Sequence, residues 1–367
     1  MKMGISRRGF IGGGAAAFSA WLSGCAEKSL DGGRSYSVAV LGDTHYDSSD
    51  PKFYHRHYTH STTKKRYELH LAEHVRNAEM WKERMPGLIR ASGACVRDDT
   101  VFALQMGDLV QGDCGNAAVH RRMLDDAFGL IKGAYGERLP LVTVVGNHDI
   151  RGDIPEDGAK ETFDAWQPPL VAQELGVHAQ GTTFSFRQGP DVFIVVDFNE
   201  PRPDFALLKR LLAESEGARY TFLVSHGPAI PNCRSRWFLL GSKRRTDERR
   251  ELRSILARRN AIVLSGHTHL LEWYDCVMPE GRVSQFVFTS VWSKPELSEP
   301  DVRRKGAKVY GGKIACTDLA DEYRPLIRDG LIANAAGHYR LEVSDERVAV
   351  VFYGGASTTP TRTFTLR

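Results

Sequence analysis

The sequence of 367 residues has little excess charge of either sign and no long apolar run. Its 49 basic and 45 acidic residues leave a formal charge of +4, too small a surplus to indicate nucleic-acid binding. The apolar stretch at residues 10–22 is only 13 residues long, whereas a membrane-spanning helix needs roughly 20. Internal repeats are also absent, so a repeat architecture is not expected.

Cysteine is scarce, and its spacing excludes a thiolate metal site. Besides Cys25 the sequence has Cys95, Cys114, Cys233, Cys276 and Cys316. No pair among these five has the spacing of a structural zinc site. Two disulfides at most can form from them, and a fully reduced set is the alternative that stays open.

Polar residues end five short runs rich in Val, Leu, Ile and Phe, which are typical of buried strands. The runs cover residues 35–42, 101–107, 141–146, 220–225 and 261–266. The polar residues that follow them are Asp43, His45, Asp108, Asn147, His226, His267 and His269. Because ligands bind outside the carboxyl ends of strands in α/β sheets, we expect these side chains to converge.

Each ending also has a simpler interpretation. Gly-Asp and Gly-Asn-His-Asp are common as turns, and the glycine before Asp108, Asn147 and His267 allows a sharp turn. His267 and His269 alternate along an extended segment, so their side chains point the same way. Five endings that offer only carboxylate, amide and imidazole groups favour a metal site over chance turns.

The order of the motifs resembles the calcineurin-like metallophosphoesterases over residues 36–290. The matching blocks are Asp43-Thr44-His45, Gly107-Asp108, Gly146-Asn147-His148-Asp149, His226 and Gly266-His267-Thr268-His269. The resemblance implies an α/β fold of four layers, in which a β-sandwich is flanked by helices. It also implies a dinuclear metal centre at one rim of the sandwich.

The resemblance further implies a role for each motif residue. Asp43, His45 and His269 would hold the first metal, Asn147, His226 and His267 the second, and Asp108 would bridge both. His148 would stand outside the coordination shell as the acid that protonates the leaving group, so the implied catalytic residues are His148 and Asp108.

The chemistry of these groups fits that assignment. Two cations about 3.5–4 Å apart can activate a water and stabilise the attacking and leaving oxygens of a phosphoryl group. Imidazole, carboxylate and amide ligands suit Mn, Fe, Zn or Co without choosing among them. We therefore expect hydrolysis of phosphate esters, with phosphodiesters favoured. A phosphomonoesterase and a nonenzymatic metal-binding scaffold are the alternatives.

Two departures from the family pattern distinguish this chain from particular branches of the family. Many protein and nucleotide phosphatases have a downstream Asp-Arg, which is missing after Asp108. Purple acid phosphatases have a tyrosine where this chain has Gln111, so a purple iron chromophore is not expected. The remaining motifs are most similar to the class III cyclic nucleotide phosphodiesterase and glycerophosphodiesterase branch.

The first 25 residues resemble an export signal. Residues 6–11 contain Arg7 and Arg8 and resemble a twin-arginine motif, and residues 22–25 resemble a lipobox that ends at Cys25. We expect residues 1–24 to be removed, Cys25 to be lipidated, and residues 25–34 to tether a periplasmic or cell-envelope lipoprotein to a membrane surface. A short membrane anchor and a disordered start are the alternatives.

The rest of the chain alternates helix and strand patterns. Helices are predicted at residues 69–92, 118–134, 205–215 and 248–259, and hairpins at 182–198 and 272–289. The predicted domain covers residues 35–290, followed by an insertion or lid at 291–337. A small C-terminal β-rich extension at 338–367 has strand patterns at 339–343, 347–353 and 361–366, and completes the sandwich or forms a small cap.

Two loops offer candidate substrate contacts. His55 and His57 follow the first motif, and Arg234 and Arg236 follow His226. Arginines near a phosphate group can bind its oxygens in pairs. A solvated loop for the histidines and an exposed basic loop for the arginines are the alternatives.

Overall fold

The computed structural model of the protein describes residues 34–367 except 49–53, 232–236, 292–300, 311–318 and 320–321. The export signal, the lipidation site Cys25 and the candidate contacts Arg234 and Arg236 therefore lie outside the described residues. Cys233 and Cys316 also lie outside them, whereas Cys95, Cys114 and Cys276 are free thiols.

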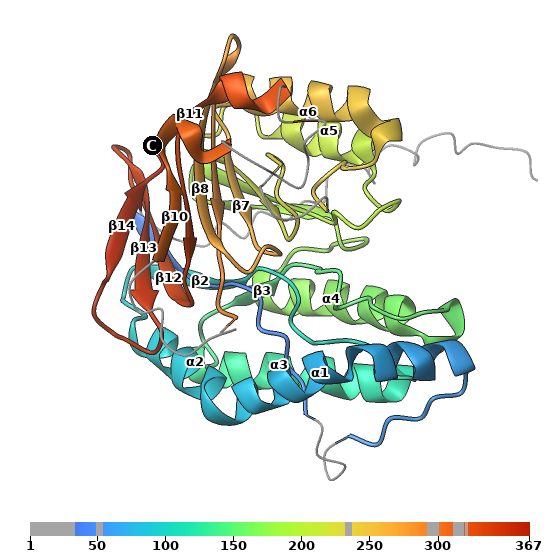
Figure 1. Ribbon diagram of the computed structural model, residues 1–367. Helices are drawn as coiled ribbons and strands as arrows, with labels where there is room; N and C mark the ends of the chain where they lie inside the picture. Colours follow the sequence, from blue (N-terminus) through green and yellow to red (C-terminus); the bar gives the residue numbers. More distant parts are fainter. Residues whose placement is uncertain (1–33, 49–53, 232–236, 292–300, 311–318, 320–321) are drawn as a thin grey trace, which may run out of the picture.

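Two mixed β-sheets form the centre of the molecule (Figure 1). The first sheet has the order β14-β13-β12-β1-β2-β3, and the second β10-β11-β8-β9-β7-β6-β5-β4. The first contains β1 (Tyr36–Leu41), β2 (Thr100–Gln105), β3 (Leu141–Thr143), β12 (Gly337–Val343), β13 (Val348–Gly354) and β14 (Arg362–Thr365). The second contains β4 (Phe184–Gln188), β5 (Asp191–Val196), β6 (Thr221–Ser225), β7 (Ile262–Ser265), β8 (Leu271–Met278), β9 (Gly281–Val287), β10 (Asp301–Lys305) and β11 (Ile327–Asn334).

Alternation of side chains along the strands builds the core between the sheets. In β1, Tyr36, Val38 and Val40 belong to the cluster between the two sheets, whereas Ala39 and Leu41 pack against helices on the outer face. Successive side chains of a strand point to opposite faces. A strand that is apolar at every position is therefore covered on both sides.

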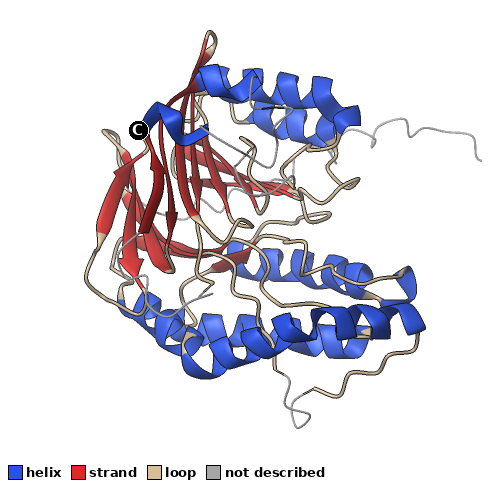
Figure 2. Cartoon of the chain, viewed as in Figure 1, coloured by secondary structure: helices blue, strands red, loops and turns tan. Residues whose placement is uncertain are grey.

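Helices supply the two outer layers, as Figure 2 shows. The described residues form α1 (Ser61–Glu83), α2 (Met85–Ala94), α3 (Ala117–Tyr135), α4 (Ala159–Leu175), α5 (Phe205–Glu214) and α6 (Thr246–Arg258). The first four lie on the side of the first sheet, and α5 and α6 lie on the side of the second (Figure 1). The predicted four-layer α/β fold is thus confirmed.

The helix boundaries follow from local chemistry. The Asn116 side chain accepts a hydrogen bond from the Val119 N–H at 2.9 Å and caps α3, which ends at Gly136 with a φ of 83°. The helix predicted at 69–92 is two helices. Pro86 lacks an N–H and cannot continue α1, so a second helix, α2, begins after Arg84.

Helix α4 was not predicted from the sequence. Pro168 and Pro169 lie inside it and would ordinarily break a helix. Trp166 nevertheless packs its edge against Phe128 of α3, with the ring centroids 5.8 Å apart. Burial of this face stabilises the helix despite the two missing N–H groups.

The segments after residue 290 belong to the sheets. Of the two alternatives for the C-terminal extension, the structure has the first: β12 pairs antiparallel with β1 and completes the first sheet. The segment predicted as an insertion or lid contributes β11, which pairs with β8, and β10 at the sheet edge. Leu331, Ile332 and Ala333 are buried there, an apolar run hidden in a polar, glycine-rich segment.

Both predicted hairpins are confirmed, as β4–β5 and β8–β9. Among the described helices, none combines the length and the apolar character that crossing a bilayer requires.

Candidate metal centre

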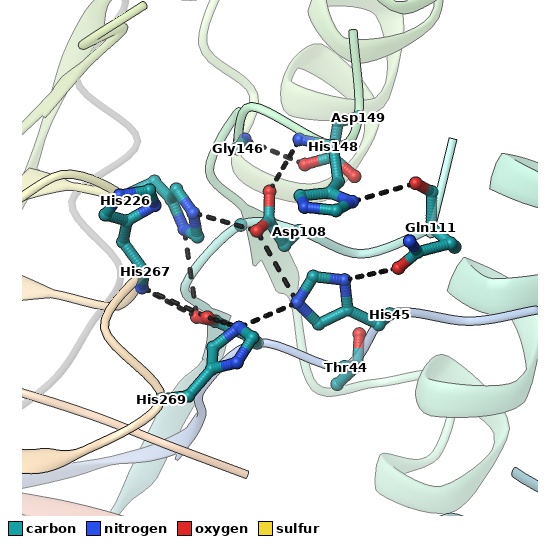
Figure 3. Close-up of polar contacts among 12 residues, drawn as sticks. Thr44, His45, Asp108, Gln111, Gly146, His148, Asp149, His226, His267 and His269 are labelled. Carbon is teal, nitrogen blue, oxygen red and sulfur yellow. Dashed lines mark hydrogen bonds and ion pairs between the residues drawn. The ribbon is translucent and has the colours of Figure 1, made fainter. Parts of the chain in front are cut away.

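All five predicted strand endings deliver their polar residues to one place. Strands β1, β2 and β3 run parallel in the first sheet, and β6 and β7 run parallel in the second. The loops after them meet at the carboxyl ends of these strands, with Asp108 between His226 and His45 (Figure 3). Residues 224 positions apart, such as Asp43 and His267, thereby come into hydrogen-bond contact.

The carboxylates and imidazoles lie within a few ångströms of each other. Asp108 Oδ2 lies 3.1 Å from His226 Nε2 and 3.6 Å from His45 Nε2. Asp43 Oδ2 lies 3.1 Å from His269 Nε2, and the His267 N–H donates to both Asp43 oxygens at 3.0 and 3.1 Å. All of these residues except His267 and His269 are fully buried.

The ligand atoms fall into two groups. Asp43, His45, Asp108 and His269 form one group, and Asp108, His226 and His267 form the other. Within each group the ligand atoms lie within 4.8 Å of one another, and Asp108 belongs to both. The division matches the one that the resemblance implies, although the assignment of these residues as metal ligands stays a prediction.

Several atoms in the cluster have the hydrogen-bonding state that a cation requires. His45 Nδ1 donates to Gln111 Oε1 at 2.9 Å, which leaves the lone pair of Nε2 free. That nitrogen lies 3.0 Å from His269 Nε2. His226 Nδ1 donates to the Met106 carbonyl at 2.7 Å, and its Nε2 makes no hydrogen bond. Imidazole ligands of metals are held in this way.

The amide of Asn147 supports the same interpretation. Its Oδ1 atom is buried and has no hydrogen-bond partner within the described part of the chain. A buried carbonyl oxygen without a partner is costly, unless a cation or water takes its lone pairs. The residues therefore fit a pair of cations with oxygen and nitrogen ligands.

Electrostatics keep the cluster anionic. Although burial opposes it, His226 and His148 hold the pKa of Asp108 well below its usual range. Burial lowers the pKa of His45 well below 6.5 and that of His267 to about 3, so both imidazoles are neutral. Against the cost of burial, Asp108 and Asp43 raise the pKa of His226 to about 9. The site thus offers charged carboxylates and the neutral imidazoles of His45 and His267 to a cation, which would have to displace the proton that Asp108 and Asp43 stabilise on His226.

The backbone of the cluster adopts unusual conformations. The φ angles are 45° at His45, 50° at Asp108, 74° at His267 and 53° at His269. Non-glycine residues rarely have positive φ, and such residues gather at functional sites. Hydrogen bonds such as His45 N–H to the Asp108 carbonyl at 2.8 Å hold these conformations in place.

The glycines before the motif residues serve two different purposes. Gly107 has a φ of 89°, as the predicted sharp turn requires. Gly146 lacks a positive φ, but a Cβ there would lie 2.1 Å from the Asp108 nitrogen. It is therefore needed for close approach of two loops and not for a turn.

His148 lies beside the cluster and outside both ligand groups. Its backbone N–H donates to Asp108 Oδ1 at 2.8 Å, and its ring meets the His45 ring edge-on at 4.5 Å. Its Nδ1 donates to the Gln111 carbonyl at 2.9 Å, so Nε2 carries the transferable proton when the ring is in its charged form. Burial lowers the pKa of His148. Its role as an acid stays a prediction.

Two residues of the site were missed as functional residues. Gln111 binds His45 through its side chain and His148 through its carbonyl. Arg151 NH1 lies 3.0 Å from His148 Nδ1, and its charge is paired with Asp113 at 2.7 Å and Glu73 at 3.4 Å. Only their closeness in sequence to Asp108 and His148 could have indicated them.

The structure does not bring His55 and His57 to the cluster. Both are exposed, and their rings face each other with centroids 4.2 Å apart. Arg56 between them turns inward to the buried Asp47 and His74. This buried ion pair turns Arg56 inward and leaves both histidines exposed, so a substrate contact by His55 or His57 stays a prediction.

Comparisons with known proteins agree with the site. Residues 36–271 match the family model of calcineurin-like phosphoesterases. No curated protein matches the chain by sequence. Among solved structures, PhoD is similar at 13% identity and a TM-score of 0.51, over 92% of this chain and 69% of that one. A purple acid phosphatase from yellow lupin (Lupinus luteus) seeds is similar at 12% identity and a TM-score of 0.50, over 92% and 54%.

These two structures show the fold, and the family model covers the segment that carries all seven of the predicted ligands. The chain therefore belongs to the calcineurin-like phosphoesterases, hydrolases that act on phosphate esters with the help of metal ions.

Proposed function

We propose that the protein hydrolyses phosphodiesters in preference to phosphomonoesters. The observation that carries this proposal is the pairing of Arg151, the guanidinium beside His148, with Asp113 and Glu73. Its charge is already balanced by two carboxylates. A phosphodiester carries one negative charge and a monoester close to two near neutral pH. The guanidinium that the described residues place beside His148 is already paired, which suits the diester better.

Each group of residues would have its own role in the reaction. When bound, two metal ions would supply the positive charge that activates water and stabilises the phosphoryl oxygens. Asp108 would lie between them, and the other carboxylate, imidazole and amide groups would hold them in place. His148, oriented by Gln111, would deliver a proton from Nε2 to the departing oxygen.

Metal analysis with two matched esters tests this proposal. Protein purified without added metal is assayed for metal content, and for turnover of bis(4-nitrophenyl) phosphate and 4-nitrophenyl phosphate before and after chelation. Readdition of Mn, Zn or Fe follows. We expect two metals per chain and a higher kcat/KM on the diester. A higher kcat/KM on the monoester would assign the site to phosphomonoesters, and turnover that survives full metal removal would contradict the two-metal centre.

Asp108→Asn provides the matched variant, because it keeps the shape of the side chain and removes its charge. We expect turnover of both esters to fall by more than about 100-fold, the upper end for groups that only support a ligand. Turnover close to wild type would contradict a bridging role for Asp108.

We also propose that the protein is exported and anchored to a membrane surface through Cys25. The signal and lipobox patterns of residues 6–25 support this proposal. Expression of the full chain and of Cys25→Ser, followed by membrane fractionation, tests it. We expect the wild type in the membrane fraction and the variant in the soluble one, and equal partition of both would contradict the anchor.

A further inference from the structure

Trp237 is an exposed aromatic side chain beside the candidate metal centre. Its exposed fraction is 60%, whereas the next three residues, Phe238, Leu239 and Leu240, are 3%, 0% and 0% exposed. An indole left in water forgoes a large gain from burial. A tryptophan that stays exposed next to three buried apolar residues therefore calls for an explanation in terms of a ligand.

The loop that carries Trp237 is held firmly on its C-terminal side. The Leu239 N–H donates to the Pro228 carbonyl at 2.9 Å. Arg249 lies 5.7 Å above the Phe238 ring and donates to the Leu240 carbonyl at 2.9 Å. These contacts place the backbone next to Trp237, so the position of the indole beside the cluster is a property of the packed fold.

The indole ring is parallel to the ring of a predicted metal ligand. Trp237 and His267 are stacked with centroids 6.2 Å apart and an interplanar angle of 14°. On another side, His267 contacts the buried Phe198 at 5.4 Å. Through His267, the indole of Trp237 thus contacts the ligand group formed by Asp108, His226 and His267.

Trp237 and His148 lie on different sides of the cluster. His148 contacts His45, and Trp237 contacts His267, and Figure 3 shows His148 and His267 on opposite sides of Asp108. In an in-line displacement the attacking water stands opposite the leaving group, and the retained group lies to the side of the line that joins them. If the leaving group departs toward His148, Trp237 lies on a side of the cluster that the leaving group does not occupy, where the retained group can lie.

We propose that Trp237 is a specificity-determining residue that stacks on a flat aromatic ring, such as a nucleobase, in the retained group of the phosphodiester. The proposal rests on the proposed phosphodiesterase function and adds its substrate class. An exposed indole face binds flat rings of any base, because every base has a π-face. Alkyl groups offer no such face and gain little from it.

Esters with a common leaving group test the proposal. Metal-loaded enzyme is assayed on 4-nitrophenyl diesters whose second group is thymidine, phenyl or methyl, so that only the retained group changes. In Trp237→Ala we expect kcat/KM on the thymidine ester to fall by about tenfold, the loss of one stacked base. The methyl ester should be hydrolysed as by the wild type, and Trp237→Phe should retain most of the preference.

The phenyl ester separates two sources of the flat ring. A loss on the phenyl and thymidine esters together indicates recognition of any aromatic ring, and a loss on the thymidine ester alone indicates a nucleoside. Either result supports the proposal. Leu69→Ala, which shortens another exposed apolar side chain with an exposed fraction of 77%, is the control and should leave all three esters unaffected.

Equal losses on all three esters, or no loss, would overturn the proposal. Binding to anionic lipid vesicles that falls in Trp237→Ala, with unchanged ester preference, would overturn it too and assign the indole to a membrane contact. A wild type inactive on every diester would instead contradict the proposed function. Quenching of tryptophan fluorescence by thymidine monophosphate would still test the stacking, since Trp237→Phe should remove it.

Discussion

At the scale of single residues, three of the predicted ligands depend on a neighbour that fixes the ring or carboxylate. His226 is oriented by the Met106 carbonyl, His45 by Gln111, and Asp43 by the His267 N–H. Groups of this kind hold imidazoles in the tautomer that a metal requires. The site is therefore defined by these supporting contacts as much as by the ligands.

Gln111 makes the most consequential of these contacts, because it binds both His45 and His148. In Gln111→Leu we expect metal affinity to fall by about 10- to 100-fold, since His45 loses the acceptor for its Nδ1–H. Metal competition with a coloured chelator measures the affinity. Gln188→Leu, a buried glutamine of β4, is the control, and an equal loss of affinity there would show that the effect is general destabilisation.

His148 leads to a prediction about leaving groups. In His148→Ala, turnover of alkyl diesters should fall by about 10²- to 10⁴-fold, whereas 4-nitrophenyl diesters, whose leaving group needs no proton, should fall far less. The protonated form of His148 declines as the pH rises through its pKa, and burial lowers that pKa. We therefore expect the alkyl diester activity that depends on His148 to be greatest toward the acidic side. Equal losses on both esters would contradict an acid role.

At the scale of elements, helix caps contribute measurable stability. Asn116 caps α3, whereas His60 at the start of α1 makes no side-chain cap hydrogen bond. We expect Asn116→Ala to lower the free energy of unfolding by about 1 kcal/mol, because a helix N–H loses its acceptor. Denaturant unfolding measures it, and His60→Ala should change the midpoint much less. A similar loss in both variants would argue against the cap.

The same scale explains which elements were hard to predict. Helix α4 contains two prolines and forms only because it is packed on α3. Strand β11 is an apolar run inside a segment that looks like a loop, and β8 supplies its hydrogen bonds. In both cases a partner distant in sequence decides the element.

At the scale of the whole molecule, acid sensitivity follows from buried neutral groups. His338 on β12 stacks on Tyr353, and burial lowers its pKa to about 4. Between pH 6.5 and 4 the unfolded chain takes up a proton that the folded chain does not, so folding stability is full above pH 6.5 and falls as the pH drops toward 4.

Replacing His338 by glutamine should remove its share of this slope, up to about 3 kcal/mol between pH 7 and pH 4. Unfolding by denaturant at several pH values measures the slope. The exposed His178→Gln is the control. A slope as steep in His338→Gln as in the wild type would show that other groups govern the acid sensitivity.

The sequence by itself determined the five strand endings, the residue types at their tips and the family. These features are local, because a buried strand needs an apolar run and the motif residues follow each strand directly. The hairpins and most helices could be predicted for the same reason. The export signal, the lipidation of Cys25 and the metal-binding role of the seven residues stay predictions from that sequence.

The tertiary structure alone decided which side chains meet. It left His55 and His57 exposed beside the inward-turned Arg56, and it brought Gln111, Arg151 and Trp237 to the cluster. Such contacts join residues up to 224 positions apart, and no local pattern encodes them. The packing of the two sheets, together with the loops that follow their strands, determines what surrounds the candidate metal centre, and hence which phosphate ester fits.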